Sequence, residues 1–367
     1  MTRVLLSTDS VGGVWRYSLE LARGFSARGI ETVLAVLGPD PNPEQAAETD
    51  GIPGLSLWTM GLPLDWTAAT PADLQQSAAA LAQLAWRTQA DTVQLHSPAL
   101  MGSTIWSVPV IAVAHSCVAT WWHAVREGPV PPDLAWRAAA TRSGLAAADA
   151  VIAPSASFAR ALADCYGLRR RIAVVPNGRR SIQTQARRRA VIQARRRAVA
   201  FTAGRLWDEG KGVATLDQAA ARVPHPVYAA GPVRSPAGQT ISCRHLRLCG
   251  SLDEPALARE YAGAAVFVSV GRYEPFGLAV LEAAQSGCAL VLSDIPTFRE
   301  LWDEAAVFVP PDDPDTLAYA LQRLLEDPTT CGQKGARARA RSVQFDPGRM
   351  AAATWATHAA ILRREAA

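Results

Sequence analysis

Short apolar runs alternate with longer amphipathic segments along most of the chain. Runs rich in β-branched residues, such as 266–270, predict buried strands, whereas apolar positions at helical spacing predict helices. Val14, Leu21 and Phe25 have that helical spacing within the segment 14–28. A regular alternation of strands and helices is typical of parallel sheets covered by helices. The sequence therefore predicts an α/β protein with two doubly wound domains.

The expected elements fall into two halves, separated by a basic segment. In the first half, strands are predicted at 3–7, 31–37, 92–95, 108–114, 149–153 and 172–175, and helices at 14–28, 72–88, 133–148 and 155–166. In the second half, strands are predicted at 199–203, 225–230, 246–249, 266–270, 289–292 and 306–309, and helices at 254–262, 275–286, 316–326 and 349–364. Residues 38–71 show no clear pattern. We expect a first domain at 1–178, a linker at 179–198 and a second domain at 199–344, followed by a C-terminal helical segment at 345–367.

The composition is that of a globular protein, because 49% of the 367 residues are apolar and 19% are charged. No apolar run approaches the roughly 20 residues that a membrane-spanning helix needs. The first three residues lead directly into a predicted strand rather than a signal peptide, so we expect a cytoplasmic protein. The six cysteines lack the paired CxxC spacing of a zinc site. Reduced thiols are therefore expected.

The net charge of +4 is unevenly distributed. Eight arginines lie between Arg179 and Arg197, and the sequence QARRRAV occurs twice there, at 185–191 and 193–199. This segment fits either a solvated linker or a patch that contacts an anionic membrane peripherally. It contains no aromatic side chain that could stack on bases, so no nucleic-acid partner is expected.

The stretch 266–300 carries the most specific signal. A predicted strand leads through a polar turn into a helix expected to begin at Pro275, because proline lacks an N–H and fits the first helical position. Gly287 is expected to end that helix. The unpaired amides of Phe276, Gly277 and Leu278 at the helix N-terminus would suit an anion such as phosphate.

Two carboxylates flank this expected anion site. Glu274 directly precedes it, and Glu282 lies two helical turns further along. Carboxylates do not bind phosphate, but they accept hydrogen bonds from sugar hydroxyls. The pattern therefore indicates a ligand with a sugar on each side of a phosphate group.

The run EPFGL at 274–278, together with Glu282, resembles the E-x7-E motif of retaining glycosyltransferases of the GT-B fold. The resemblance is specifically to glycosyltransferase family 4, the group 1 transferases. It implies two Rossmann-like domains that face each other across a cleft. It also implies that Glu274 contacts the donor sugar, that the amides of residues 276–278 hold the pyrophosphate, and that Glu282 binds the ribose.

Other positions extend this resemblance. Arg205 and Lys211 resemble the arginine and lysine that hold the donor diphosphate in this family, although the spacing here is one residue longer than the common form. The turn at Gly12 and Gly13 resembles the N-terminal loop of the family, and a glycine turn allows a ligand to approach the backbone closely. His115 resembles a histidine that lies near the donor sugar. The structural alternatives are a tight strand-to-helix turn for Gly12 and Gly13, a core position for His115, and ordinary surface charge for Arg205 and Lys211.

Several assignments stay open from the residues alone. His96, like His115, directly follows a predicted strand, so both are expected at the same edge of one sheet. Trp121, Trp122 and His123 form an aromatic cluster on a predicted loop. Such side chains fit acceptor recognition or core packing equally well.

Asp313 and Asp315 match a D-x-D pattern, which holds a divalent metal in other transferases. An aspartate at the N-cap, a proline at the first helical position and an acid in the first turn explain the pattern fully. We therefore expect a helix start here and no metal site.

The resemblance implies a retaining, metal-independent glycosyltransferase of the hexosyltransferase type that needs no cofactor. It would move a sugar from a nucleotide-diphosphate sugar, bound by the second domain, to a hydroxyl acceptor: a glycan, a lipid or a small metabolite. The final helix is expected to pack on the first domain. A sugar-nucleotide epimerase of the same fold and a non-catalytic scaffold for anionic surfaces are the alternatives. The identities of sugar, base and acceptor depend on pocket shape rather than on a readable motif.

Overall fold

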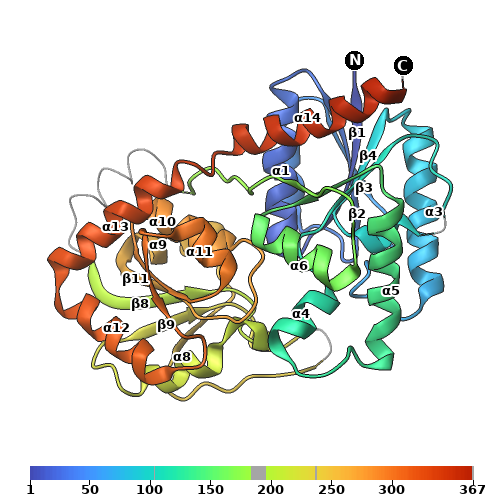
Figure 1. Ribbon diagram of the computed structural model, residues 1–367. Helices are drawn as coiled ribbons and strands as arrows, with labels where there is room; N and C mark the ends of the chain where they lie inside the picture. Colours follow the sequence, from blue (N-terminus) through green and yellow to red (C-terminus); the bar gives the residue numbers. More distant parts are fainter. Residues whose placement is uncertain (103, 183–195, 236–237, 366–367) are drawn as a thin grey trace. The chain divides into compact units, whose positions relative to one another are not determined.

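The computed structural model describes the chain except for residues 103, 183–195, 236–237 and 366–367 (Figure 1). The chain divides into two compact units. Unit 1 comprises Met1–Arg179 and Asp346–Ala367, and unit 2 comprises Arg180–Phe345. Each unit is built on one sheet of parallel strands with helices packed on both faces. The predicted pair of doubly wound α/β domains is confirmed.

The sheet of unit 1 has seven strands in the order β3-β2-β1-β4-β5-β6-β7. The strands are β1 (Arg3–Asp9), β2 (Glu31–Leu37), β3 (Leu55–Thr59), β4 (Thr92–Leu95), β5 (Val110–Val113), β6 (Ala150–Ala153) and β7 (Ala173–Val174). The strand order reverses between β1 and β4. Ligands of open α/β sheets bind beside such a switch point, at the carboxyl ends of the strands.

Helices cover both faces of this sheet because its strands carry apolar side chains on both sides. Helices α1 (Gly13–Ser26) and α14 (Pro347–Glu365) pack on one face. Helix α3 (Pro71–Arg87) and the short helix η1 (Pro98–Met101) pack on the other, together with α5 (Pro132–Ala147). The remaining helices of unit 1 are α2 (Pro43–Asp50), α4 (Val118–Val125) and α6 (Ala156–Tyr166).

Helix α14 packs against α1, although more than 300 residues separate the two in the chain (Figure 1). A Cβ atom placed on Gly24 of α1 would lie 2.3 Å from the Cβ of Ala351 of α14. The two helices therefore touch at backbone distance. The C-terminal segment of the chain completes the core of unit 1.

The sheet of unit 2 has six strands in the order β10-β9-β8-β11-β12-β13, so its order reverses between β8 and β11. The strands are β8 (Arg197–Ala203), β9 (Val227–Ala230), β10 (Arg247–Gly250), β11 (Ala264–Ser269), β12 (Ala289–Ser293) and β13 (Ala306–Val309). The helices are η2 (Glu209–Lys211), α8 (Val213–Ala220), α9 (Glu254–Gly263), α10 (Leu278–Ser286), α11 (Pro296–Trp302), α12 (Pro314–Glu326) and α13 (Pro328–Ser342).

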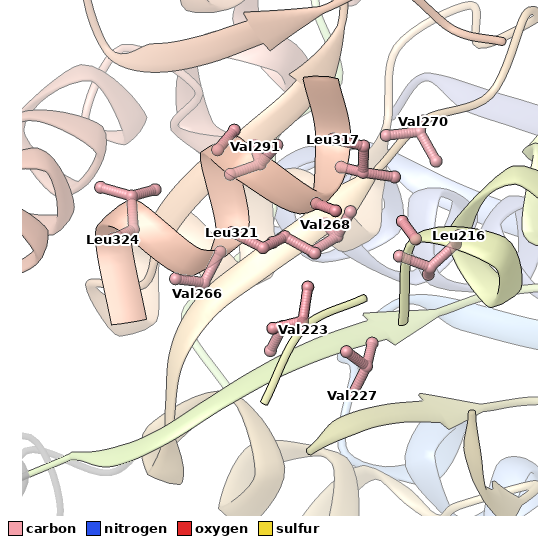
Figure 2. Packing of buried hydrophobic residues seen from close by; sticks show 14 of the residues in the cluster. Leu216, Val223, Val227, Val266, Val268, Val270, Val291, Leu317, Leu321 and Leu324 are labelled. Carbon is pink, nitrogen blue, oxygen red and sulfur yellow. The ribbon is translucent and has the colours of Figure 1, made fainter. Parts of the chain in front are cut away.

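One face of this second sheet is packed with aliphatic side chains (Figure 2). Leu317 and Leu321 of α12 lie against Val266 and Val268 of β11. All four side chains are excluded from solvent. Burial of such side chains contributes about 1.5–3 kcal/mol each, which holds the strand that leads into the 271–277 loop.

The structure corrects three predictions. The unpatterned region 38–71 contains α2 and β3. Residues 118–125, predicted as a loop, form helix α4. Helix α10 begins at Leu278 and not at Pro275, because Gly277 has φ +92 and interrupts the helical backbone just before it. The sequence also gave no prediction for α8, α11 and α13.

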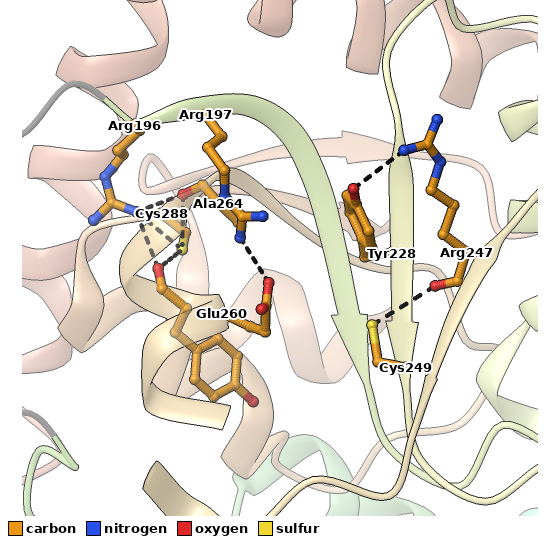
Figure 3. A network of polar contacts seen from close by, with 9 residues as sticks. Arg196, Arg197, Tyr228, Arg247, Cys249, Glu260, Ala264 and Cys288 are labelled. Atoms are coloured by element: carbon orange, nitrogen blue, oxygen red, sulfur yellow. Dashed lines mark hydrogen bonds and ion pairs between the residues drawn. The ribbon is translucent and has the colours of Figure 1, made fainter. Parts of the chain in front are cut away.

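The predicted basic linker lies mostly outside the described residues, as does the repeated QARRRAV sequence except for its last residues. Its end, Arg196 and Arg197, is engaged within unit 2 (Figure 3). Arg196 donates hydrogen bonds to the carbonyls of Tyr261, Ala264 and Ser286, which lie at the C-terminal ends of α9 and α10. Arg197 already belongs to β8 and forms an ion pair with Glu260 at 2.7 Å. These two arginines therefore anchor the start of the sheet.

Candidate active site

The switch point of unit 2 brings together the two loops that carry most of the predicted donor site. The loop after β8 carries Arg205 and Lys211, and the loop after β11 carries Glu274. Lys211 Nζ lies 2.6 Å from Glu274 Oε2. Both side chains are largely buried, with 26% and 16% of their areas exposed. The longer spacing between Arg205 and Lys211 therefore does not prevent Lys211 from reaching Glu274.

Contact between the backbones of the two loops fixes this ion pair. A Cβ on Gly212 would lie 2.3 Å from the carbonyl oxygen of Val270, and a Cβ on Gly271 would lie 2.3 Å from that of Gly210. Tyr273 N donates to the same Gly210 oxygen at 3.3 Å. No side chain fits between the loops. The loops therefore hold Lys211 and Glu274 side by side through backbone packing.

Arg205 is held differently. Its guanidinium donates to Asp208 Oδ2 at 3.1 Å, and Asp208 Oδ1 accepts from Gly210 N at 3.0 Å. The Asp208 carboxylate thus ties the arginine to the turn that carries Lys211. The Arg205 side chain is 58% exposed, so its guanidinium remains accessible from solvent.

The N-terminus of α10 lies beside this pair. Leu278 is the first helical residue and Gly277 is its N-cap. A Cβ on Gly277 would lie 3.4 Å from Glu274 Cγ and 3.2 Å from a ring carbon of Phe298. Phe276 is buried in the core, and its amide faces Glu274 Oε1 at 3.5 Å. The prediction that the Phe276 amide is unpaired is therefore wrong, because it donates to Glu274. The corrected boundary leaves the first amides of α10, from Leu278 onward, to attract an anion beside Glu274.

Glu282 lies on α10, which is buried along most of its length, and only 6% of the residue is exposed. A buried carboxylate is costly unless it is hydrogen-bonded.

The switch point of unit 1 carries a glycine loop and two histidines. Gly12 has φ +88, a backbone conformation that favours glycine, and Gly13 is the first residue of α1. Asp9 Oδ1 accepts from Val11 N at 2.8 Å and so closes the loop. His96 directly follows β4, and its ring centroid lies 5.2 Å from that of His115, just after β5. The prediction that both histidines end strands at one sheet edge is confirmed.

The two histidines lie among uncharged rings, and His96 is buried whereas His115 is half-buried. The ring of Tyr17 packs edge-on against His115 at 4.6 Å and against His96 at 5.1 Å. Burial lowers the pKa of His115 to about 4. It also lowers the pKa of His96 well below its usual range, and the neighbouring His115 and His358 lower it further. Burial raises the pKa of Tyr17 to about 12, which neighbouring Thr354 and Gln94 partly offset. The rings are thus neutral at pH 7.

Two further features of unit 1 are an aromatic pair on α4 and an open pocket. Trp121 and Trp122 are partly buried on α4, with ring centroids 6.4 Å apart, and Trp122 donates to the carbonyl of Gly128. His123 is exposed. Separately, an open pocket of 410 Å³ lies at the carboxyl ends of β2 and β3. It is lined by Gly38, Pro39, Asp40, Gly61, Leu62, Pro63 and Thr67.

The other predicted features have structural roles. Asp313 caps α12 by accepting from the amides of Asp315 and Thr316, which confirms the helix-start interpretation of the D-x-D pattern. All six cysteines are free thiols. Within the described ranges, no helix is long and apolar enough to cross a membrane.

The sequence reasoning missed two residues that shape these sites. Asp208 could have been noticed as an acid three residues after Arg205, in a turn. Gln94 could have been noticed as a polar residue at an inward position of a fully buried strand, where a polar side chain needs partners.

Comparisons with known proteins agree on one family. Residues 11–180 match the model of Glycosyltransferase Family 4, and residues 197–327 match that of Glycosyl transferases group 1. The chain is 36% identical over 106 residues to a phosphatidyl-myo-inositol mannosyltransferase of Mycolicibacterium smegmatis, and 35% identical over 125 residues to a glycogen synthase of Mycobacterium tuberculosis. These alignments cover 28% and 33% of this chain, but only 27% and 30% of the two relatives.

Solved structures resemble the chain over its whole length. Sucrose-phosphate synthase from Thermosynechococcus elongatus superposes with a TM-score of 0.80 at 20% identity, covering 99% of this chain and 100% of that structure. HepE from Anabaena, solved in complex with UDP, gives 0.69 at 16% identity, covering 98% and 100%. These likenesses show the GT-B fold. With both family models matched in sequence order, the chain belongs to glycosyltransferase family 4, the group 1 glycosyl transferases.

Proposed function

We propose that the chain is a retaining, metal-independent glycosyltransferase that moves a sugar from a nucleotide-diphosphate sugar to a hydroxyl acceptor. One observation carries the proposal. The Lys211–Glu274 pair, 2.6 Å apart, lies at the switch point of unit 2 beside the N-terminus of α10. An ammonium group, which suits phosphate, and a carboxylate, which suits sugar hydroxyls, therefore lie together at the edge where open α/β sheets bind ligands.

Lys211 stabilises the leaving diphosphate in this proposal. An ammonium group has three donors, so Lys211 can keep its bond to Glu274 while it donates to a phosphate oxygen. The amides at the start of α10 and the guanidinium of Arg205 add positive potential. These fixed donors supply the charge stabilisation that a divalent ion provides in other transferases.

The two glutamates orient the donor. Glu274 has one oxygen bound to Lys211, and its remaining acceptor capacity suits hydroxyls of the transferred sugar. Glu282, buried on α10, is assigned to the ribose hydroxyls of the nucleotide. Two carboxylates on either side of a phosphate site match the order of groups in a nucleotide-diphosphate sugar.

The transfer itself needs no covalent intermediate on the protein. The bond between the anomeric carbon and the diphosphate oxygen breaks while the acceptor oxygen bonds to the same face of that carbon. The acceptor proton passes to the leaving phosphate oxygen. Neutral His115 is assigned a hydrogen-bonding role toward the sugar, and Gly12 and Gly13 allow close approach of the backbone.

The acceptor is assigned to unit 1. The 410 Å³ pocket has a carboxylate, Asp40, and no cationic residue in its lining, which suits a neutral hydroxyl-rich molecule better than a phosphorylated one. It adjoins the glycine loop, because Ser10 Oγ donates to the carbonyl of Pro39 at 2.7 Å. The relatives named above are a mannosyltransferase and a glycogen synthase, so donors with different sugars and bases need to be tested.

The first test is a thermal-shift screen with UDP, GDP, ADP and their common sugar conjugates. A ligand that binds only the folded state raises Tm by mass action. We expect one nucleotide to stabilise the protein, and Glu282→Gln to weaken that binding about tenfold without lowering the Tm of the free protein. Absence of stabilisation by every nucleotide would overturn the proposed function.

The identified donor is then incubated with neutral and phosphorylated acceptors, with and without EDTA. The proposal expects a product whose anomeric configuration equals that of the donor, as read by NMR, at a rate that EDTA does not change. Isomerised donor without added acceptor would instead show an epimerase. Loss of activity in EDTA, restored by a divalent ion, would refute metal independence.

A further inference from the structure

The central strand β4 carries a stripe of polar residues on one face. Thr92 and Gln94 alternate with apolar residues along the strand, and His96 continues the alternation directly after it. Because strand side chains alternate between faces, all three point to the face covered by α1 and α14. Thr92 is 1% exposed, Gln94 0% and His96 7%. Polar groups so deeply buried need defined partners.

The partners come from both covering helices. The Gln94 side chain lies between two histidines. Its Nε2 is 2.8 Å from His96 Nε2, and its Oε1 is 2.9 Å from Nε2 of His358 on α14. The far side of His358 contacts Thr92 Oγ1 at 3.2 Å. The far side of His96 contacts Ser18 Oγ of α1 at 3.1 Å.

The chain continues to the glycine loop. Ser18 Oγ lies 2.9 Å from Thr8 Oγ1, and Thr8 Oγ1 donates to the carbonyl of Asp9 at 3.2 Å. Asp9 in turn closes the loop that contains Gly12. Contacts at hydrogen-bonding distance therefore lead from the C-terminal helix to Asp9 at the end of β1. Ser18 Oγ also lies 2.8 Å from the Val14 carbonyl, so its single proton is donated either to Thr8 or to Val14.

The chemistry of the amide restricts where the protons lie. Both histidines are neutral at pH 7, because burial lowers the pKa of His358 to about 3 and that of His96 well below its usual range. Each ring therefore carries a single N–H. The amide oxygen of Gln94 can only accept and its nitrogen can only donate. One histidine must present a protonated Nε2 to Gln94, and the other a bare Nε2.

With Gln94 Oε1 facing His358, that ring holds its proton on Nε2, and its bare Nδ1 accepts from Thr92 Oγ1, which then cannot also donate to the Pro109 carbonyl at 3.1 Å. His96 holds its proton on Nδ1, directed at Ser18. Rotation of the amide by half a turn would exchange both assignments together. In neither orientation can the two rings be the same tautomer while both bonds to Gln94 exist.

We propose that Gln94 is a positioning residue that forces His96 and His358 into opposite tautomers, and so couples the C-terminal helix to the glycine loop. The fixed tautomer of His96 also affects His115 at the unit 1 switch point, because the His96 ring packs against both Tyr17 and His115. A fixed His96 tautomer keeps Ser18 and the start of α1 in one hydrogen-bonded arrangement.

The direct test is the tautomer of each ring, read from long-range ¹H–¹⁵N correlations of the full chain at pH 7.5. The variants His96→Asn and His358→Gln assign the signals by their disappearance. The expected result is one ring protonated on Nδ1 and the other on Nε2. Two rings in the same tautomer, or either ring charged, would overturn the proposal.

Gln94→Glu sharpens this test when infrared spectroscopy at pH 7.5 shows the introduced group to be ionised, because an ionised carboxylate only accepts, whereas a protonated carboxyl also donates and would act like the amide. Nε2 of both rings should then be protonated, whether the rings are neutral or charged. Gln94→Met, which has a similar volume but can satisfy neither ring, should release the coupling and let each tautomer equilibrate separately. A His96 that keeps a bare Nε2 in Gln94→Glu would refute the role of the amide.

A second test measures kcat of the variants, and it rests on the proposed glycosyltransferase function. In Gln94→Glu we expect kcat to fall about tenfold or more, since small displacements of site groups slow catalysis. The affinity for the nucleotide, bound by unit 2, should stay within about twofold. Parallel loss of nucleotide affinity would indicate a general structural effect and contradict the positioning role. Failure of the parent protein to bind any nucleotide would instead refute the proposed function, and the tautomer measurement would still decide this inference.

Discussion

The two switch points of the molecule share a topology but differ in chemistry. In unit 2, loops after β8 and β11 pack backbone against backbone and hold a charged pair, Lys211 and Glu274, that is partly open to solvent. In unit 1, the neutral rings of His96 and His115 lie just after β4 and β5, and buried hydrogen bonds through Gln94 join His96 to His358 of α14. The same strand arrangement thus supports an ionic site and a neutral one.

This difference matches what each site is proposed to do. A leaving diphosphate carries developing charge, and fixed cations and amides stabilise it best where they are preorganised. An acceptor hydroxyl and a sugar are neutral, so orientation by hydrogen bonds is sufficient. Close glycine contacts hold the ionic site of unit 2, whereas buried polar side chains hold the neutral site of unit 1. Substitutions at the two sites should therefore have different effects on activity and stability.

The largest effect is expected on kcat, when the positive charge of Lys211 in unit 2 is removed. Lys211→Ala should lower kcat by about 10²–10³-fold, as removal of one fixed donor to a developing anion does elsewhere. The Kd for the nucleotide should change much less, because amides of α10 and Glu282 remain. Steady-state kinetics and calorimetry measure the two quantities.

Lys334 on α13 provides the control, since Lys211 and Lys334 are the only lysines in the sequence. Lys334→Ala should retain the parent kinetics. Equal turnover of Lys211→Ala and the parent would remove the ionic site from the proposal.

The next effect concerns how the loops of unit 2 are held. Gly212→Ala should lower the free energy of unfolding by about 2–3 kcal/mol, because φ is +66 there and the added Cβ would meet the Val270 carbonyl at 2.3 Å. Gly332→Ala is the matched control, as its Cβ would meet no atom within 4 Å on α13. That substitution should be neutral or slightly stabilising. Urea unfolding of both variants measures the difference, and equal stabilities would show that the loops can separate.

The acid sensitivity of unit 1 is expected to give the smallest effect, when it is counted per histidine and per pH unit. Its folded state keeps His96, His115 and His358 neutral, whereas an unfolded chain protonates histidine below about pH 6.5. Their lowered pKa values therefore make the unfolded state bind more protons as the pH falls. Stability is fully present above about pH 6.5 and is lost towards the folded pKa values, by up to about 1.4 kcal/mol per pH unit for each histidine.

Hydrogen exchange of each unit between pH 7.5 and 4.5 tests this window. Unit 1 should open first, although Asp65, whose pKa burial raises, opposes part of the loss. In unit 2, hydrogen bonds lower the pKa values of Asp294, Asp313 and Asp327, so their contribution is lost only below the ordinary aspartate pKa. Loss of protection in unit 2 before unit 1 would contradict the assignment of buried neutral histidines.

Elements with strong periodicity or strong caps were predictable, and the others were not. The strand at β11 and the capped helix α12 follow directly from an apolar run and from Asp313 with Pro314. The edge strand β3 was missed because it lies half exposed and lacks a clear apolar face. Helix α2 carried a readable signal in its capping box, Asn42 and Gln45, that the apolar pattern did not reveal.

Some features depend on segments far apart in the chain, and no local pattern could show them. The contact between Gly212 and Val270 exists only because β8 and β11 are neighbours in the sheet. Gln94 obtains its partners from His96, just after β4, and from His358 of α14, 264 residues away.

The sequence by itself determined the alternation of elements, the two doubly wound sheets, the family and the residue types at the donor site. These follow from periodicity, turn chemistry and short motifs, which are local. Tertiary structure decided that Lys211 reaches Glu274, that α10 starts only at Leu278, and that two histidines share one glutamine. Those outcomes depend on strand order and helix packing, which set the distances between residues that sequence spacing alone leaves free.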